Sequence, residues 1–291
     1  MKAVGVIGVG AMGMGVARAL LARGFPVFVR DIVAAREAEA VANGARACRS
    51  PAEMARQCER IVTLVVNARQ TREILFAEDG AVRGMERGGV VMMCSTIAPT
   101  DAAAIADQLA RHDLAMLDAP ISGGPARAEA GTLSMMAAGS DAAFELAADV
   151  LAATATKLFR VGPRCGDGSK VKIVNNMLAG VNLAAGCEAM ALGERLGLDP
   201  KLLYEVICAS SGASWMFADR MKRALAEDWE PRAAARILTK DLQLLLDTAE
   251  AAGFDAEIAR VAHAVFEDTV ARGFGGEDDA AVLKRYRKRG P

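Results

Sequence analysis

A lysine and two asparagines near the middle of the 291-residue chain are spaced like side chains that share one face of a helix. Lys172, Asn175 and Asn176 stand three and four residues apart, and residues at these separations are neighbours on an α-helix. The apolar run 177–181 follows, so we expect a buried helix that begins near Gly168. Desolvation lowers the pKa of a lysine, which lets the amine accept and return a proton near neutral pH. Lys172 is therefore a candidate acid/base group, and the alternative is a surface lysine on an amphipathic helix.

A glycine-rich segment near the N-terminus has the pattern of a dinucleotide-binding turn. The run 2–7 predicts a buried strand, the sequence G-x-G-x-x-G follows, and 14–23 has a helical pattern. Gly8 would allow a tight turn, Gly10 would let the backbone approach a pyrophosphate, and Gly13 would let helix and strand pack closely. The first N–H groups of the helix would face the phosphates. The residues that we expect to bind the cofactor here are Gly8, Gly10, Ala11, Met12 and Gly13.

The residue after the second predicted strand bears on the identity of the dinucleotide. Asp31 follows the strand 26–30 and lies 23 residues after Gly8, which is about the spacing at which an acidic residue meets the ribose 2′-hydroxyl. A carboxylate accepts a hydrogen bond from that hydroxyl and repels a 2′-phosphate, which favours NAD over NADP. Arg30 would favour NADP if its side chain turned inward. Asp31 could instead be only a turn residue or a helix cap.

Strand and helix patterns alternate through the first part of the chain. The expected strands are 2–7, 26–30, 61–66, 89–94, 114–118, 133–138 and 158–161, with helices such as 100–111 and 142–153 between them. This alternation predicts an α/β fold, a Rossmann-type doubly wound sheet of mostly parallel strands, in which ligands bind at the carboxyl ends of the strands. The polar residues that follow strands, and should line that edge, are Asp31, Asn67, Ser95, Thr96 and Ser122.

The strand patterns stop after Gly162-Pro163, and the rest of the chain reads as helical. The expected helices are 169–194, 200–210, 213–227, 231–252 and 255–272. We therefore predict an NAD-binding Rossmann domain over 1–163 and an all-helical substrate and oligomerisation domain over 164–291, joined by a long helix. That helix is crowded with small apolar residues, which favours a homodimer or homotetramer, although an internal core helix fits them too. They are Ala184, Ala185, Ala189, Ala191 and Leu192.

The composition excludes several classes of protein. The 35 basic and 36 acidic residues nearly cancel, so we expect no nucleic-acid or membrane partner, and the basic end 284–289 reads as a solvated tail. There is no signal-peptide pattern, and apolar runs are broken by charge or glycine before they reach membrane-spanning length, which predicts a cytoplasmic protein. The six cysteines form no CxxC pair and do not cluster with the two histidines, which predicts free thiols and no metal site.

Four motifs agree with one known family in order and spacing. They are the glycine turn, Ser95-Thr96-Ile97-Ala98-Pro99, Asp118-Ala119-Pro120-Ile121-Ser122-Gly123-Gly124 with Gly131-Thr132-Leu133, and the Lys172-x-x-Asn175-Asn176 helix. With Lys240-Asp241-Leu242 as a later motif, the whole chain resembles the 3-hydroxyisobutyrate (β-hydroxyacid) dehydrogenase family. The resemblance implies that Lys172 is the catalytic acid/base. It also implies that Ser122, Gly123, Gly124 and Asn176 hold the substrate carboxylate, and that Thr96 and Lys240 contact the cofactor.

Finer features resemble the L-threonate dehydrogenase branch of that family. They are found in 64–68, 168–173, 214–217 and 275–279. Many relatives have a leucine–proline pair where this chain has Val65-Val66, and Val66 and Asn67 are the corresponding candidate contacts to the cofactor. The resemblance implies NAD-dependent oxidation of the hydroxyl of a small hydroxy acid, such as L-threonate or a similar four-carbon sugar acid. The alternatives are a 2-hydroxy-3-oxopropionate (tartronate semialdehyde) reductase, a 3-hydroxyisobutyrate dehydrogenase, and a non-catalytic dinucleotide-binding interaction module.

Overall fold

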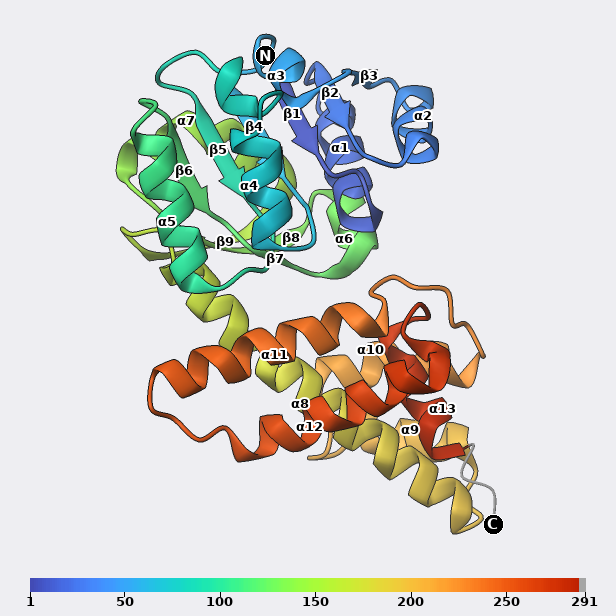
Figure 1. The fold of residues 1–291 in the computed structure, drawn as a ribbon. Helices are drawn as coiled ribbons and strands as arrows, with labels where there is room; N and C mark the ends of the chain where they lie inside the picture. Colours follow the sequence, from blue (N-terminus) through green and yellow to red (C-terminus); the bar gives the residue numbers. More distant parts are fainter. Residues whose placement is uncertain (288–291) are drawn as a thin grey trace. The chain divides into compact units, whose positions relative to one another are not determined.

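The computed structural model describes residues 1–287, and the chain divides into two compact units (Figure 1). The first unit ends at Lys172 and the second begins at Ile173. This division lies inside helix α8 (Asp167–Arg195), whereas the sequence placed the boundary just before that helix, between 163 and 164. Of the basic end 284–289, Lys288 and Arg289 lie outside the described residues.

The first unit is built on one nine-stranded sheet. Its strands are β1 (Val4–Ile7), β2 (Val27–Arg30), β3 (Arg46–Ala47), β4 (Arg60–Thr63), β5 (Val90–Met93), β6 (Ala115–Asp118), β7 (Ile121–Ser122), β8 (Leu133–Ala138) and β9 (Ala155–Gly162). They lie in the order β3-β2-β1-β4-β5-β6-β8-β7, with β9 beside β8. Neighbours from β3 to β6 are parallel, while β8 is antiparallel to β6 and β7 and parallel to β9. The predicted α/β fold with a mostly parallel sheet is confirmed.

Helices cover both faces of this sheet (Figure 1). They are α1 (Ala11–Ala22), α2 (Ala34–Ala42), α3 (Pro51–Ala55), α4 (Ala68–Phe76), the 3₁₀ turn η1 (Ala81–Arg83), α5 (Pro99–Ala110), α6 (Gly124–Ala130) and α7 (Asp141–Thr154). In β5, Val90 and Met92 pack with residues of α1 and α7, and Val91 and Met93 pack with residues of α3, α4 and α5. A strand buried on both faces explains the continuous apolar run from which the sequence predicted it.

Two strands differ from their predicted bounds by three residues at one end, and the two-residue strands β3 and β7 were not predicted. The expected strand 61–66 ends at Thr63. The N–H of Leu64 still donates to the carbonyl oxygen of Ile7 in β1 (2.8 Å), but the two donors after it bond to side chains. The N–H of Val65 donates to Ser95 Oγ (3.1 Å), and the N–H of Val66 donates to Gln70 Oε1 (2.8 Å). Strand β9 begins at Ala155, before the expected 158, and the two-residue β7 lies in a stretch that reads as a turn.

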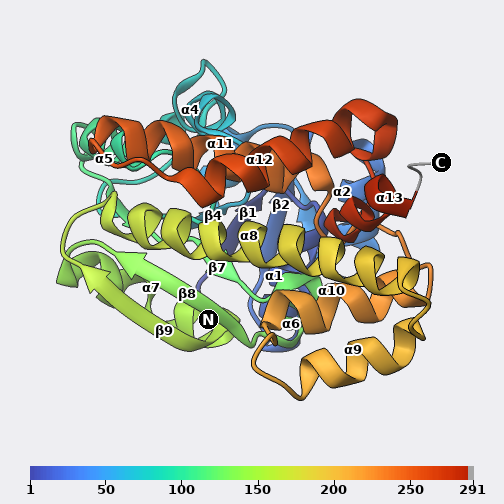
Figure 2. The same cartoon turned by 90° about the horizontal axis from the view of Figure 1, so that it is seen from below.

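The second unit is all-helical. After the greater part of α8 come α9 (Pro200–Cys208), α10 (Trp215–Leu225), α11 (Ala235–Ala251), α12 (Glu257–Thr269), the short turns η2 (Val270–Phe274) and η3 (Asp279–Ala281), and α13 (Val282–Arg287). Figure 2 shows α8 running lengthwise between α11 and α12 on one side and α9 and α10 on the other. The core formed by Leu183, Cys187 and Met190 of α8 is completed by Phe217 and Phe266.

The small apolar residues of α8 divide between the core and the surface of this unit. Ala184 and Ala191 are buried in the core, as the core-helix alternative expects. Ala185, Ala189 and Leu192 are exposed. The six cysteines, all within residues 1–287, form no disulfide. No helix in that range combines the length and the apolar character needed to cross a membrane, and no His, Cys, Asp or Glu cluster there could hold a metal ion.

Two glycines of the first turn provide a test of the packing. A Cβ atom on Gly13 would lie 1.9 Å from the carbonyl oxygen of Gly8, whereas a Cβ on Gly10 would approach nothing closer than 3.5 Å. We expect Gly13→Ala to lower the free energy of unfolding by about 1–3 kcal/mol or more, because the helix must move off the strand. Gly10→Ala should cost less than about 1 kcal/mol, the range for a helix N-cap. Thermal unfolding of both variants checks this, and equal melting temperatures would contradict it.

Candidate functional site

The sheet of the first unit ends its parallel strands in one row. Ile7 is in register with Arg30 on one side and with Thr63 on the other, and the row continues through Met93 to Asp118. Each next residue leaves the sheet at its carboxyl edge. This is the edge where open α/β sheets bind their ligands. The loops that begin here, and the first residues of the elements that follow them, include the predicted residues of the first unit, apart from Lys172 on α8: Gly8, Gly10, Ala11, Met12, Gly13, Asp31, Val66, Asn67, Thr96, Ser122, Gly123 and Gly124.

The glycine turn has the geometry that the sequence predicts for it. Gly8 has φ +89°, and a Cβ atom there would lie 2.5 Å from the carbonyl oxygen of Leu64, so only glycine fits. Helix α1 begins at Ala11, immediately after Gly10. A hollow of about 220 Å³ opens beside Gly10 and Ala11 and is also lined by Arg36. The space beside Gly10 and the N–H groups of the first helical turn suit a diphosphate.

Asp31 braces this turn from the end of β2. Its Oδ2 atom accepts a hydrogen bond from the N–H of Val9 (2.8 Å), and its Oδ1 atom accepts one from the N–H of Val33 (2.9 Å). Asp31 therefore has the structural role of a turn residue, as the alternative interpretation expects. Each carboxylate oxygen can accept a further hydrogen bond, so the brace is compatible with a ribose contact.

Arg30, the residue that would favour NADP, is engaged by a carboxylate that the sequence analysis did not consider. Its Nη1 atom lies 2.7 Å from Glu37 Oε1, and it also donates to the carbonyl oxygen of Asp31. The same Glu37 oxygen accepts the N–H of Asp31 at 2.8 Å. The sequence signal was an acidic residue in the first turn of the helix after β2, where glutamate is favoured.

Val66 and Asn67, the predicted cofactor contacts after β4, lie at the start of helix α4. Asn67 is the N-cap of α4, and its Oδ1 atom accepts the N–H of Gln70 at 2.9 Å. Val66, just before it, is exposed. Thr96 is half-buried in the loop after β5, next to Ser95, whose hydroxyl holds the Val65 N–H. The capping role of Asn67 explains its residue type without a ligand.

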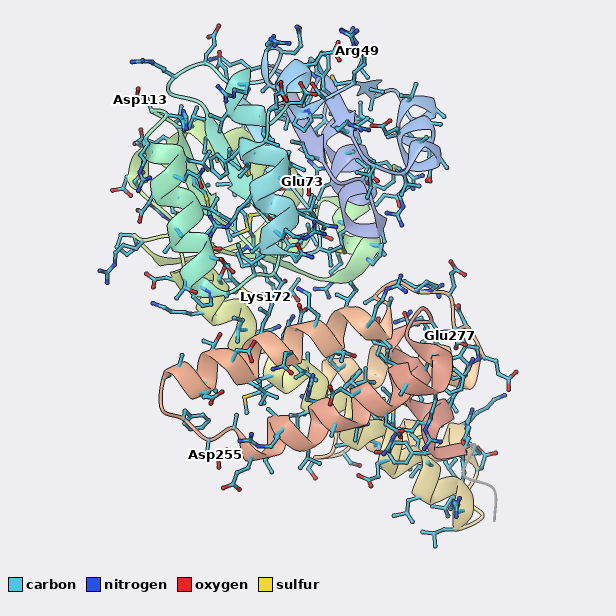
Figure 3. All side chains as sticks on the ribbon, viewed as in Figure 1. Arg49, Glu73, Asp113, Lys172, Asp255 and Glu277 are labelled. Atoms are coloured by element: carbon cyan, nitrogen blue, oxygen red, sulfur yellow. The ribbon has the colours of Figure 1, made fainter. Side chains whose placement is uncertain are left out.

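Lys172 lies against the segment that follows β6. Its Nζ atom donates to the carbonyl oxygen of Ile121 at 2.8 Å, and the residue is only 9% exposed, so it is not the surface lysine of the alternative interpretation. Figure 3 labels it on α8. Ser122 follows Ile121 directly, and Gly123 and Gly124 have φ values of +136° and +76°. The structure thus brings Lys172 next to the predicted Ser-Gly-Gly turn.

A buried carboxylate fixes the start of α8 and hence the position of Lys172. Asp118 Oδ2 accepts the N–H groups of Gly166 (2.7 Å) and Ser169 (2.8 Å), and Oδ1 accepts the Ser169 hydroxyl (2.8 Å). Burial raises the pKa of the Asp118 carboxyl group, and the hydrogen bonds from Ser169 and Gly166 oppose that shift. The sequence placed Asp118 in a motif and predicted no separate role for it. Its signal was a carboxylate at a strand end together with a serine in the first turn of helix α8.

In the second unit, one carboxylate holds two predicted residues. Asp241 is buried, its Oδ2 atom accepts the Asn176 amide N–H at 2.8 Å, and its Oδ1 atom lies 2.8 Å from Lys240 Nζ. The Asn176 Oδ1 atom in turn accepts the Asn175 amide at 3.2 Å. Asp241 belongs to the Lys240-Asp241-Leu242 motif, and the sequence predicted no role for it.

Two family models together cover nearly the whole chain. Residues 3–162 match the NAD-binding domain of 6-phosphogluconate dehydrogenase. Residues 166–286 match the NAD-binding region of NADP-dependent 3-hydroxyisobutyrate dehydrogenase. The matched ranges include all the predicted site residues.

Full-length relatives agree with these matches. The L-threonate dehydrogenase of Cupriavidus necator is 48% identical, with 97% of this chain and 95% of that one covered. The L-threonate dehydrogenase of Escherichia coli is 43% identical, over 97% and 94%. The crystal structure of 3-hydroxyisobutyrate dehydrogenase from Salmonella typhimurium superposes with a TM-score of 0.92 at 42% identity, over 98% and 100%. The chain therefore belongs to the 3-hydroxyisobutyrate (β-hydroxyacid) dehydrogenase family, whose members are oxidoreductases of hydroxy acids.

Proposed function

We propose that this protein oxidises the hydroxyl group of L-threonate, or of a similar four-carbon sugar acid, with NAD as the oxidant. The observation that carries the proposal is the buried Lys172 Nζ atom held against the Ile121 carbonyl, one residue before Ser122-Gly123-Gly124, on a Rossmann fold. The choice of substrate rests on relatives named L-threonate dehydrogenase, which are 41–48% identical over nearly the whole chain.

The dinucleotide would be held at the carboxyl edge of the sheet. Gly8, Gly10, Ala11, Met12 and Gly13 would take the pyrophosphate, and Asp31 the adenosine ribose. The family resemblance also implies cofactor contacts for Val66, Asn67, Thr96 and Lys240. When bound, NAD supplies the acceptor for the hydride. The open space beside Gly10 fits this group.

The chain's own residues would bind the carboxylate of the substrate and transfer the proton of its hydroxyl group. A hydroxyl must lose its proton as the hydride leaves, and the Lys172 amine would accept that proton and return it in the reverse direction. The Ile121 carbonyl, as a hydrogen-bond acceptor, orients the amine. Ser122 with the N–H groups of Gly123 and Gly124 would bind the substrate carboxylate, since successive N–H groups in positive-φ turns form anion-binding nests. Asn176, held by Asp241, would contribute its amide.

A panel of hydroxy acids tests the proposal. We expect NADH to form fastest with L-threonate, compared by kcat/KM with 3-hydroxyisobutyrate, L-serine and 2-(hydroxymethyl)glutarate. A reductase of tartronate semialdehyde would use the same residues in reverse, and would consume NADH with that aldehyde more efficiently than it forms NADH from any acid. Binding of NAD without turnover of any compound would support the non-catalytic interaction module and contradict the proposal.

We also propose that the helical unit forms a homodimer or homotetramer. Val174 and Leu178 on α8 are 60% and 58% exposed, and the exposed Ala185, Ala189 and Leu192 continue the same helix. Large apolar side chains exposed in a row are typical of interaction surfaces. The partner that we propose is a second copy of the chain.

The first prediction of the proposal concerns Lys172. Lys172→Ala should lower kcat by about 10²–10⁴, the usual contribution of a positioned proton-transfer group, with little change in NAD affinity. Lys172→Arg should restore little, because a guanidinium stays protonated near neutral pH. The matched control is Lys170→Ala on the same helix, since Lys170 is exposed and pairs with Asp167 at 2.8 Å. Equal losses in Lys172→Ala and Lys170→Ala, or an active Lys172→Arg, would show that Lys172 only supplies charge.

The second prediction concerns Asp31. Because its carboxylate braces the Val9 and Val33 N–H groups, Asp31→Ala should weaken the binding of both NAD and NADP. The loss should be larger for NAD, so the preference for NAD should shrink. The measurement is kcat/KM for each cofactor in the two proteins. A wild-type enzyme that prefers NADP would refute this role of Asp31.

The third prediction concerns the assembly. Light scattering at micromolar concentration should give two or four times the mass of one chain, and Leu178→Glu should reduce it, because a charge would enter an apolar contact. Lys222→Glu, at an exposed position on α10, should leave the mass unchanged. A monomeric wild-type protein would end this proposal.

A further inference from the structure

We propose that Glu37 determines the preference for NAD by engaging Arg30, the cation next to Asp31. This inference rests on the proposed dinucleotide site and adds to it a residue that acts through another. Glu37 would be a positioning residue, since its carboxylate contacts Arg30 and the Asp31 backbone and no contact with the cofactor is required of it.

The geometry of the Glu37 carboxylate is fixed from two sides. Its Oε1 atom lies 2.7 Å from Arg30 Nη1 and 2.8 Å from the N–H of Asp31. The side chains of Arg30 and Glu37 are 29% and 18% exposed, so water screens this pair less than a fully exposed one. Glu37 also lies in the first turn of α2, where the helix dipole favours a negative charge.

The consequence of this contact is electrostatic. A guanidinium has a planar fork of donors that suits a phosphate, so Arg30 beside Asp31 is a ready recognition group for a 2′-phosphate. Glu37 occupies one end of that fork and the Asp31 carbonyl also accepts from it. Arg30, Asp31 and Glu37 together carry a formal charge of +1 − 2 = −1. A net negative group at the ribose repels a 2′-phosphate and tolerates a hydroxyl.

Other cations near the turn stand in different positions. Arg36 Nη1 would lie 3.5 Å from a Cβ atom on Gly10, against the turn that meets the pyrophosphate, and NAD and NADP share that group. Arg18 pairs with Glu39 at 2.9 Å and with Glu129 at 3.4 Å. Of these three arginines, Arg30, which Glu37 contacts, is therefore the one placed to discriminate between the two nucleotides.

The experiment is a direct titration of the full-length protein with NADH and NADPH, followed by the fluorescence of the nucleotide. Glu37→Gln releases Arg30 with little change of shape, and should lower the ratio of the Kd for NADPH to the Kd for NADH by about tenfold or more, the effect of one hydrogen bond to a charged group. Adding Arg30→Gln to that variant should return the ratio toward the wild-type value. Glu39→Gln, two residues along α2 and paired with Arg18, is the matched control and should leave the ratio unchanged.

Each outcome decides the inference. An unchanged ratio in a folded Glu37→Gln variant overturns it, as does an equal loss of affinity for both nucleotides, which would mean a structural role only. If Glu37→Gln does not fold, Glu37→Asp withdraws the carboxylate by one methylene and should shift the ratio in the same direction by less; no shift overturns the inference. A wild-type protein that binds neither nucleotide overturns the proposed function and this inference together, whereas binding of both with unchanged ratios in the variants overturns the inference alone.

Discussion

The buried Asp118 carboxylate accepts three hydrogen bonds, and the proposed chemistry depends on them. Asp118 ends β6, and its partners Gly166 and Ser169 stand at the start of α8. The fit is tight, since a Cβ atom on Gly168 would lie 2.3 Å from the Asp118 carbonyl oxygen. Ile121 lies three residues after Asp118, and Lys172 lies three residues after Ser169. The anchor therefore places the amine and the carbonyl that accepts from it at a fixed separation, which a proton-transfer group requires.

At the carboxyl edge of the sheet, a polar residue that follows a strand is weak evidence of a binding role. Asp31 accepts two backbone N–H groups and Asn67 caps a helix, so each has a structural reason to be there. Such contacts leave lone pairs over, so structural and binding roles are compatible. Two glycines of the turn indicate a nucleotide more strongly, because their surroundings differ. At Gly13 a side chain would clash with the neighbouring backbone. At Gly10 a Cβ atom would clash with no atom of the described residues, so the packing of the protein does not explain the glycine there.

The sequence predicted the sheet, the helices and the family because each rests on local patterns. The buried run of β5 and the G-x-G-x-x-G turn carry their structural meaning within a few residues. What it could not predict are contacts between positions far apart in the chain. Asp118 meets Ser169 across 51 residues, and Asn176 meets Asp241 across 65. The early end of β4 is of the same kind, because the Ser95 hydroxyl that accepts the Val65 N–H belongs to a different loop. Such partners follow from topology and not from spacing.

Asp241 shows how a carboxylate outside the predicted set can decide what a predicted residue offers. An amide group has two donor hydrogens on nitrogen and an acceptor oxygen, and its orientation follows from its partners. Asp241 requires the Asn176 nitrogen to face it, and the Asn175 amide donates to the Asn176 oxygen. One hydrogen on the Asn176 nitrogen is then left to donate. A substrate carboxylate accepts hydrogen bonds and cannot donate them, so this orientation makes Asn176 suitable for binding an acid. Lys240 Nζ lies 2.8 Å from the other oxygen of Asp241, so this one carboxylate contacts both a residue proposed to bind the substrate and a residue proposed to bind the cofactor.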